Sequence, residues 1–351
     1  MTQRVNRESN IELLRILAMF FILVQHANFL GIGMPTANEC IVSPINSFIR
    51  FFIESLSIVA VNIFIFISGW FGIKSTVKKL CSFLFQVLFF TLSLLLIHGI
   101  LYGWHSISGS DILKAFLVTK CYWFVKSYIC LFILSPILNL FSEKASKRTF
   151  QLVLIGFFAV QSFFGWTDSA PEFYYGYSAL SFIGLYLLAR YLYLNPVCWL
   201  SKRKRCLISY IFLSAIPALA GWLLVRFDIY TNYAIPIAFS FINPVVILAS
   251  IALFFVFHNS KAGYSKVINW IAVSTFSVYI IHINGFVFHW FQEGVWFFYS
   301  HFPIILRWLL VLCFLALVFI ACVLFDKLRI LAWKRIEYLF DKWPKSHQIG
   351  L

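Results

Sequence analysis

Long apolar runs follow one another along almost the whole chain, and short polar segments separate them. A helix that crosses the hydrocarbon core of a bilayer needs about 20 mostly apolar residues, so each run predicts one membrane-spanning helix. The predicted spans, about ten in number, are 11–31, 47–72, 80–102, 122–141, 149–166, 174–194, 206–226, 235–257, 267–290 and 303–325. The segment 112–120 is too short to cross and is interpreted as an interfacial or re-entrant piece. The pattern predicts an all-α integral membrane protein built as a bundle of transmembrane helices.

The composition supports this class and excludes a soluble protein. Of 351 residues, 62% are hydrophobic and 12% are charged, whereas soluble proteins have roughly 45–50% and 25%. The chain also contains 42 Phe, 16 Tyr and 12 Trp residues. A soluble surface cannot hide so many apolar rings, but lipid-facing positions accept them.

The charged residues predict the orientation of the bundle. Clustered cations fall on alternate connections between the runs: Arg4, Arg7, Lys74, Lys78, Lys79, Lys144, Lys147, Arg148, Lys202, Arg203, Lys204, Arg205, Lys261, Lys266, Lys327, Arg329, Lys334, Arg335, Lys342 and Lys345. The other connections carry acidic residues and few cations: Glu39, Asp111, Asp168, Glu172, Asp228 and Glu293, with Lys114, Lys120 and Arg226. Because cytoplasmic loops are enriched in Lys and Arg, both chain ends are predicted to be cytoplasmic. This placement explains the net charge of +15 without nucleic acid as a partner.

The predicted spans fill residues 1–326, which are interpreted as one transmembrane domain without a soluble catalytic domain. Residues 327–351 combine apolar and aromatic positions at helical spacing with Lys and Arg, which predicts a cytoplasmic amphipathic tail along the inner leaflet. The first apolar run contains ionisable residues and is interpreted as a retained helix rather than a cleaved signal peptide. The eight Cys residues show no CxxC or metal-ligand spacing, so no metal site is predicted.

The first span contains the largest group of polar side chains, Glu12, Arg15, Gln25, His26 and Asn28. Arg15 and His26 are separated by about three helical turns, so they share one face about 16 Å apart along the axis. Glu12 lies three positions before Arg15, close enough to pair with it. Taken alone, Arg15 could be an arginine at the membrane interface, and His26 could be a histidine hydrogen-bonded to a neighbouring helix. Two ionisable groups that share a face inside a span instead favour a functional site.

In the predicted orientation Arg15 lies near the cytoplasmic surface and His26 lies toward the outer half. Arg can hold a phosphate group by two parallel hydrogen bonds. His can act as a general base toward a hydroxyl, or as a transient acyl acceptor. The pair therefore fits a phosphate-bearing acyl donor that enters from the cytoplasm.

Other spans add candidate site residues. The second span contains Asn62 and the pair Ser68-Gly69, for which close helix packing is the simpler explanation. Lys74, Lys78 and Lys79 follow directly and either bind the donor or only set the topology. Trp123 and Lys126 begin the fourth span, and Tyr279 and His282 lie three positions apart on the ninth. Residues predicted to line a substrate cavity are Glu12, Asn62, Ser68, Trp123, Lys126, Tyr279 and His282. No role is predicted for His98, His258, His289 and His301.

Four segments, in this order, resemble motifs of the membrane acyltransferase-3 family, bacterial enzymes that place acyl groups, most often acetyl, on cell-surface glycans. They are ELLRILAMFFILVQH at 12–26, NIFIFISGWF at 62–71, YWFVKSYICLFILSPILN at 122–139 and STFSVYIIH at 274–282. The resemblance covers nearly the whole chain. It implies that Arg15 acts on the donor side and that His26 is catalytic. Where the family often shows an Arg-rich stretch after Ser-Gly, this chain has Lys78 and Lys79, which lack the planar fork of Arg.

The resemblance implies a stand-alone O-acyltransferase in the bacterial inner membrane. Its co-substrate would be acetyl-CoA or another acyl-CoA, with no permanently bound cofactor, and its acceptor a surface polysaccharide or a lipid-linked sugar. Membrane lipids are the remaining expected partner. Two other functional hypotheses remain open: a transporter or flippase for a lipid-linked glycan, and a polysaccharide polymerase. A transporter predicts no acyl-CoA binding, and a polymerase predicts a large outer loop with Arg or His.

Overall fold

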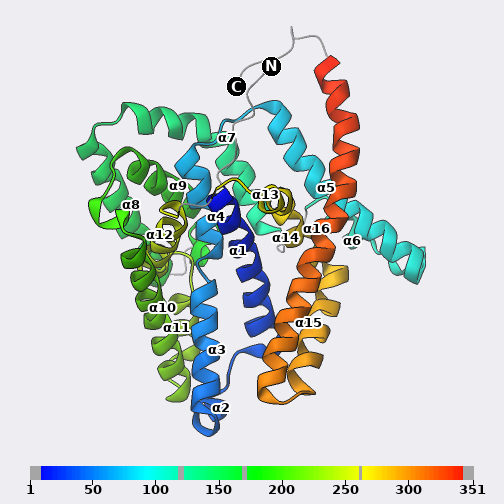
Figure 1. Ribbon diagram of the computed structural model, residues 1–351, viewed down its shortest axis with the longest axis horizontal. Coiled ribbons are helices and arrows are strands. Elements are labelled where there is room, and N and C mark those ends of the chain that lie inside the picture. The colour runs from blue at the N-terminus through cyan, green and yellow to red at the C-terminus, as the bar shows by residue number, and fades with distance from the viewer. Residues whose placement is uncertain (1–8, 118–121, 168–171, 261–262, 343–351) are drawn as a thin grey trace. The chain divides into compact units, whose positions relative to one another are not determined.

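The computed structural model describes residues 9–117, 122–167, 172–260 and 263–342. Within these ranges every regular element is a helix, as Figure 1 shows. The chain forms two compact units, each built from separate stretches of sequence. The first comprises Met1–Gly72 and Ile137–Ala272, and the second comprises Ile73–Pro136 and Val273–Leu351.

The helices of the two units are as follows. The first unit contains α1 (Ser9–Gln25), η1 (His26–Gly33), α2 (Ala37–Val42), α3 (Pro44–Ser57), α4 (Ala60–Phe71), α8 (Lys147–Thr167), η3 (Tyr174–Gly176), α9 (Ala179–Leu194), η4 (Cys198–Ser201), α10 (Arg203–Arg226), α11 (Thr231–Ala238), α12 (Pro244–His258) and α13 (Lys266–Ala272). The second contains α5 (Val77–Tyr102), η2 (Trp104–Ser106), α6 (Gly109–Ala115), α14 (Thr275–His282), α15 (Gly285–Ser300) and α16 (Ile304–Lys342). The boundary at Pro136 divides α7 (Trp123–Lys144) between them.

Several of these helices have membrane-spanning length. Seven described segments are long and apolar enough to cross a bilayer, and the bent pair Lys266–His282 and Gly285–Ser300 makes eight if it is one span. The seven are Ser9–Gly33, Pro44–Phe71, Val77–Tyr102, Trp123–Lys144, Lys147–Gly165, Arg203–Arg226 and Leu306–Tyr338. These helices confirm the predicted all-α class and give the chain the character of a multi-pass membrane protein.

The count of ten spans and the cytoplasmic placement of both ends stay predictions. Two of the ten predicted spans correspond to the shorter apolar helices α9, with 16 residues, and α12, with 15. Six of the cations and acids used to predict orientation lie outside the described residues: Arg4, Arg7, Lys120, Asp168, Lys261 and Lys345.

Three predicted spans are less regular than one straight α-helix. The first changes at His26 from the α-helix α1 to the π-helix η1. The second is interrupted at Ile58 and Val59, where α3 gives way to α4. The span predicted over 267–290 stays a prediction, because the chain bends by 92° at the break between His282 and Gly285, as in a broken span or a re-entrant loop. Asn284 caps the new helix by accepting a hydrogen bond from the Phe286 amide at 3.0 Å, which fixes where α15 begins.

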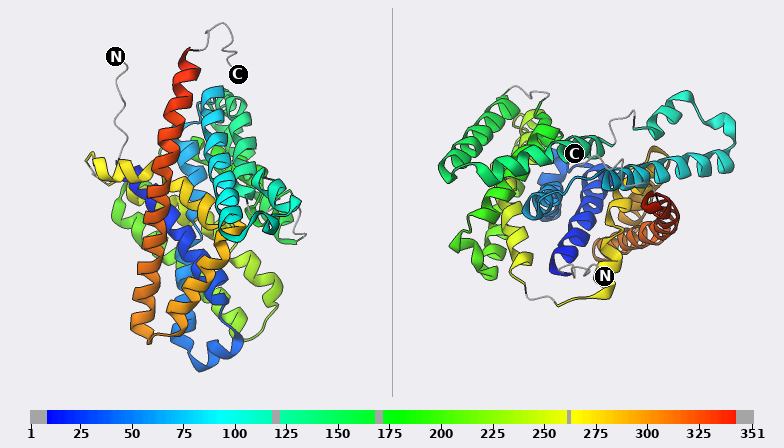
Figure 2. Two further views of the ribbon diagram at one scale, coloured as in Figure 1. Left: turned by 90° about the vertical axis from the view of Figure 1, so that its right-hand side faces the viewer. Right: turned by 90° about the horizontal axis from the view of Figure 1, so that it is seen from above.

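The C-terminal helix α16 has 39 residues and continues through the predicted domain boundary at 326–327. Figure 2 shows it as one unbroken helix. Arg329 pairs with the buried Asp326 through two hydrogen bonds of 2.8 Å, so the continuation past the span carries its own buried ion pair. The division into a domain and a membrane-surface tail stays a prediction, and residues 343–351 lie outside the described residues.

Close packing in the first unit depends on small and polar residues. A Cβ on Gly69 of α4 would lie 2.6 Å from the Tyr186 carbonyl oxygen and 2.8 Å from the Ala189 Cβ of α9. Only glycine lets these two helices approach so closely, as small residues do in membrane helix pairs. Hydroxyl groups connect α3 to α10, where Ser55 donates to the Ser214 carbonyl and Tyr210 to the Leu56 carbonyl, both at 2.5 Å.

Candidate functional site

The Glu12–Arg15 pair expected from the sequence is present near the start of α1. Arg15 Nη1 donates to Glu12 Oε1 at 3.0 Å, and the Arg15 side chain is 32% exposed against 5% for Glu12. The carboxylate therefore holds the guanidinium from the buried side, while part of the Arg15 side chain remains exposed.

His26 stands at the junction between α1 and η1 and is half-buried. Arg15 and the residues up to Gln25 are α-helical, so the shared face predicted for Arg15 and His26 is maintained to the junction. The π-helix η1 has eight residues and follows α1 directly, and π-helical geometry is rare in proteins. His26 is thus the residue at which the first span changes its helical geometry.

A buried polar network fixes η1 against α3. Asn28 donates to Glu54 Oε2 at 3.0 Å and to the Arg50 carbonyl at 2.9 Å. Arg50 donates from Nε to Asn28 Oδ1 at 3.3 Å, from Nη2 to the Asn28 carbonyl at 3.0 Å, and also to the Gly33 carbonyl. All three side chains in this network are at most 5% exposed. The widened turn that begins at His26 is therefore held by buried hydrogen bonds inside the unit.

The second-span candidates have structural partners. Asn62 is fully buried and donates to the Phe241 carbonyl at 2.9 Å. Ser68 donates to the Phe64 carbonyl of its own helix at 2.9 Å. Gly69, next to Ser68, makes the close contact with α9 described above. These contacts are consistent with the packing explanation for this motif.

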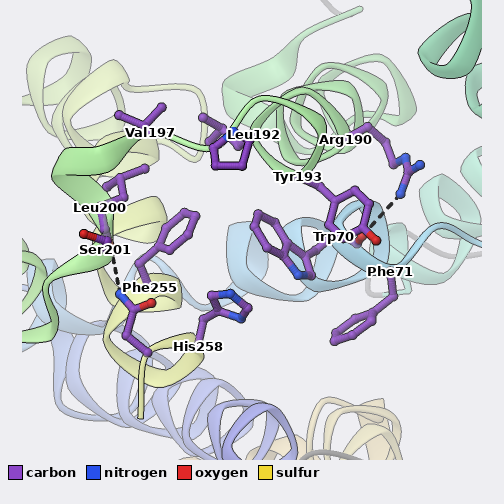
Figure 3. A pocket seen from close by; sticks show the side chains of 12 residues that line it. Trp70, Phe71, Arg190, Leu192, Tyr193, Val197, Leu200, Ser201, Phe255 and His258 are labelled. Atoms are coloured by element: carbon purple, nitrogen blue, oxygen red, sulfur yellow. Dashed lines mark hydrogen bonds between the residues drawn. The ribbon is translucent and has the colours of Figure 1, made fainter.

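The aromatic residue that follows Ser68-Gly69 lines a pocket of about 670 Å³ in the first unit, drawn in Figure 3. The Trp70 ring lies 5.3 Å from Tyr193, 5.4 Å from Phe255 and 4.9 Å from His258, measured between ring centroids. Arg190 of α9 also lines the pocket, with its guanidinium carbon 5.1 Å from the centre of the Tyr193 ring. Because the tight α4–α9 contact places Trp70 beside Arg190, the Ser-Gly-aromatic motif helps to build this pocket.

The pocket adjoins the start of the first helix. Asn10 donates to the carbonyl oxygens of Phe257 at 3.1 Å and His258 at 3.4 Å, at the end of α12. His258 is itself a lining residue. The backbone that forms one wall of the pocket is thus tied to the helix that carries Arg15 and His26.

The three lysines of the candidate donor site belong to the second unit. Lys78 forms an ion pair with Glu337 at 3.1 Å, and Lys79 Nζ donates to the Lys74 carbonyl at 2.9 Å. The Lys74 and Lys79 side chains are exposed, and Lys78 is half-buried. One of the three charges is therefore balanced by a carboxylate of α16.

The remaining candidates are also in the second unit. Tyr279 is 5% exposed, and its ring lies 5.8 Å from that of Phe124. The fully buried His282 donates from Nδ1 to the Val278 carbonyl at 2.6 Å. Trp123 is half-buried and Lys126 is exposed. None of the four lines the pocket of about 140 Å³ that this unit contains between Thr91, Tyr122 and Asn284.

The rim of this smaller pocket is charged. Asp111 of α6 pairs with Lys114 at 2.9 Å and also lies on the pocket. Its carboxylate accepts a hydrogen bond from the Ser108 hydroxyl at 2.6 Å. These hydrogen bonds, that from Ser108 first, lower the pKa of Asp111 to about 2, so the carboxylate is ionised at neutral pH.

The sequence candidates thus fall into two groups. Glu12, Arg15, His26, Asn62 and Ser68 lie in the first unit, and Lys74, Lys78, Lys79, Trp123, Lys126, Tyr279 and His282 lie in the second. Within the first unit the structure brings Glu12 and Arg15 into contact and keeps His26 on their helix. Among the described residues no group of three or more His, Cys, Asp or Glu side chains could hold a metal ion.

The family profile described as an acyltransferase domain, Acyl_transf_3, matches residues 8–327. The chain belongs to the acyltransferase-3 family. No curated protein and no solved structure matches it. Membership covers nearly all of the described helices and identifies the chain as a transferase of acyl groups, as the sequence resemblance implied.

Sequence reasoning missed four side chains of this acyltransferase: Arg50 and Glu54 beside η1, and Arg190 and His258 in the pocket. The sequence could have pointed to the first three, because each is an ionisable residue within a predicted span. Inserting such a residue into the membrane costs free energy, so it is a candidate for a functional role. His258 gave no such signal, since it lies at the end of an apolar run and only the fold brings it to Trp70.

Proposed function

We propose that this acyltransferase transfers an acyl group, most simply acetyl, from acyl-CoA to a hydroxyl of a cell-surface polysaccharide or lipid-linked sugar. The proposal includes a multi-pass location in the bacterial inner membrane with both chain ends in the cytoplasm. Family membership supports the reaction class. The observation that carries the residue assignment is the position of Arg15 and His26 on one helix, with the carboxylate of Glu12 on Arg15 and a π-helix beginning at His26.

On the donor side, Arg15 binds a phosphate group of CoA. A guanidinium already oriented by Glu12 loses little freedom on binding, and its fork matches two phosphate oxygens. Lys74, Lys78 and Lys79, which follow the second span in the sequence, are proposed as further positive charge for the donor. The thioester then extends along the helix toward His26.

On the acceptor side, His26 takes the proton of the sugar hydroxyl as the hydroxyl oxygen attacks the thioester carbonyl. A carbon–oxygen bond forms, the carbon–sulfur bond breaks, and the CoA thiolate leaves and receives the proton from the imidazole. In the alternative order of steps, the imidazole nitrogen of His26 first attacks the thioester carbonyl and the CoA thiolate leaves. The sugar hydroxyl then attacks the acyl-imidazole, takes the acyl group and releases the imidazole. Tyr279 and His282 are proposed to line the acceptor cavity.

The test is acetyl-CoA binding to the purified protein in detergent, combined with an acyl-transfer assay in membranes. Arg15→Ala should weaken acetyl-CoA binding about tenfold or more, because a charged hydrogen-bonding group is lost. His26→Ala should abolish transfer while it leaves binding and membrane insertion intact. Wild-type protein that is folded but binds no acyl-CoA would instead favour the glycan transporter, and transfer retained without His26 would remove its catalytic role.

A further inference from the structure

A buried arginine in the pocket of the first unit has no counter-charge among the described residues. Arg190 is 9% exposed, and its Nε lies buried without a hydrogen-bond partner. Its guanidinium donates from Nη1 to the Trp70 carbonyl at 3.3 Å and forms no ion pair within the described part of the chain. Because a buried charge is costly unless it is paired, an anion from outside the chain is expected beside it.

The contact with Trp70 accounts for only one of the hydrogen-bond donors of Arg190. Trp70 lies in the last turn of α4, where a cation that binds a carbonyl stabilises the helix end. That role uses Nη1 and leaves the buried Nε–H without a partner. An arginine at a helix end can also satisfy its remaining donors in water, but the Nε–H of Arg190 is buried.

The surroundings of Arg190 match an anion that carries a planar aromatic group. Trp70, Tyr193, Phe255 and His258 present rings to the same pocket, as Figure 3 shows. Bases stack on such rings, and an Arg fork binds phosphate oxygens. A lipid headgroup needs the cation but has no use for the rings, so the lining favours a nucleotide.

The chain adds positive charge at the edge of the pocket. Ser201 lines it, and the four residues that follow are exposed cations: Lys202, Arg203, Lys204 and Arg205. Such a cluster raises the local concentration of an anionic ligand. The pocket volume of about 670 Å³ lies within the range of roughly 300–1,000 Å³ that small-molecule sites have.

We propose that this pocket binds the adenosine phosphate end of the acyl-CoA donor, with Arg190 on the phosphate and Trp70 and Tyr193 against the base. The inference rests on the acyl-CoA-dependent reaction proposed above and adds a second donor contact to Arg15. The pocket wall at His258 is hydrogen-bonded to Asn10, and Arg15 lies five positions, or about 7.5 Å along the axis, further on. The pantetheine arm therefore leaves the pocket beside the helix that carries Arg15 and His26.

The experiment measures binding of acetyl-CoA and of adenosine 3′,5′-bisphosphate to the purified full-length protein by calorimetry. Arg190→Gln should weaken both ligands by about tenfold to a hundredfold, as expected when hydrogen bonds to a charged group are lost. Arg15→Ala should weaken acetyl-CoA alone, because the bisphosphate occupies only the pocket. Arg190→Lys, which keeps the charge without the fork, should give intermediate affinity.

Arg226→Gln provides the matched control. Arg226 donates to the Cys40 carbonyl at 2.8 Å and lies 5.1 Å from the Trp222 ring, so it has the same kinds of contact as Arg190 outside the pocket. Its loss should leave both affinities unchanged. If Arg190→Gln does not fold, Arg190→Lys and Tyr193→Leu carry the test, since each should weaken the bisphosphate by itself.

The outcomes separate this inference from the proposed function. Tight acetyl-CoA binding that is unaffected by Arg190→Gln overturns the nucleotide pocket and leaves the acyltransferase proposal standing. Arg190-dependent binding of the bisphosphate without binding of any acyl-CoA supports a nucleotide site and overturns the donor assignment. Arg190-dependent binding of anionic phosphatidylglycerol in nanodiscs, with no binding of the bisphosphate, identifies a lipid headgroup as the occupant and refutes the inference.

Discussion

At the scale of single residues, one amide connects two buried ionisable side chains at the point where the first helix widens. Asn28 accepts a hydrogen bond from Arg50 and donates one to Glu54, so each of the two side chains has a polar partner inside the protein. Such networks are favourable only when every member has its partners. Asn28 also lies two positions after His26, so the network determines the backbone path of the proposed catalytic residue.

Replacing Asn28 by Leu, a side chain of similar size, should therefore destabilise the protein by about 3 kcal/mol, because two buried groups lose a partner at about 1–3 kcal/mol each. Thermal unfolding in detergent measures the effect. Asn195→Leu is the matched control and should lower stability far less, since among the described residues the Asn195 amide donates only to the Tyr191 carbonyl of the preceding helix. Equal melting temperatures for the two variants would show that the network contributes little.

The residue-scale chemistry was only partly predictable from the sequence. The Glu12–Arg15 contact follows from three-residue spacing on a helix, which is local geometry. Arg190 and Trp70 are far apart in sequence and meet because α4 and α9 pack closely, which no local pattern encodes. The same holds for Asn28 and Glu54. Ionisable residues within apolar runs indicated which side chains needed partners, but the fold decides which partners they have.

At the scale of elements, Gly69 determines how closely α4 approaches α9, and this distance sets the position of Trp70 beside Arg190. Gly156 of α8 provides a contrast, since a Cβ there would meet nothing within 4 Å. The two glycines lie in apolar helices of similar composition, yet only one is required by its neighbours.

Gly69→Ala should therefore destabilise the protein by about 1–3 kcal/mol, the usual cost of overpacking, and should also weaken acetyl-CoA binding by displacing α4 from Arg190. Gly156→Ala should be neutral or stabilising by up to about 1 kcal/mol, because alanine favours the helix. Melting temperature and calorimetric affinity, recorded for both variants, give the comparison. If Gly69→Ala melts like wild type, α4 and α9 have room to separate and the pocket does not depend on their contact.

Element types were predicted more reliably than element regularity. Apolar runs define helices well, because a bilayer requires every backbone group to be hydrogen-bonded within the segment. The π-helix that begins at His26 is held instead by a tertiary partner. Arg50, for example, bonds backbone carbonyls of η1 from another helix, a contact that a hydropathy pattern does not contain.

At the scale of the whole molecule, the question is whether α9 and α12 cross the bilayer. Their lengths argue against crossing, and the placement of the cations argues for it. With 16 residues, α9 is about 24 Å long, less than a hydrocarbon core of about 30 Å. If neither helix crosses, however, the Lys202–Arg205 cluster falls on the outer side, against the positive-inside rule. A short helix can be accommodated by local thinning of the bilayer at a fraction of a kcal/mol per Å, whereas four misplaced cations oppose the orientation directly. On the charge argument we expect both helices to cross.

Labelling single cysteines with a membrane-impermeant maleimide in intact cells tests this topology. Lys204 and Tyr230 are both exposed and lie on either side of α10. If α9 and α12 both cross, Tyr230→Cys should be labelled and Lys204→Cys should react only after the membrane is permeabilised. If neither crosses, Lys204→Cys should be labelled and Tyr230→Cys should react only after permeabilisation. Lys144→Cys should stay protected in both cases and serves as the reference. Ten spans would place the Lys202–Arg205 cluster on the cytoplasmic side together with Trp70, where acyl-CoA is found. The opposite labelling pattern would put the cluster on the opposite side from Trp70, although Trp70 and Ser201 line the same pocket.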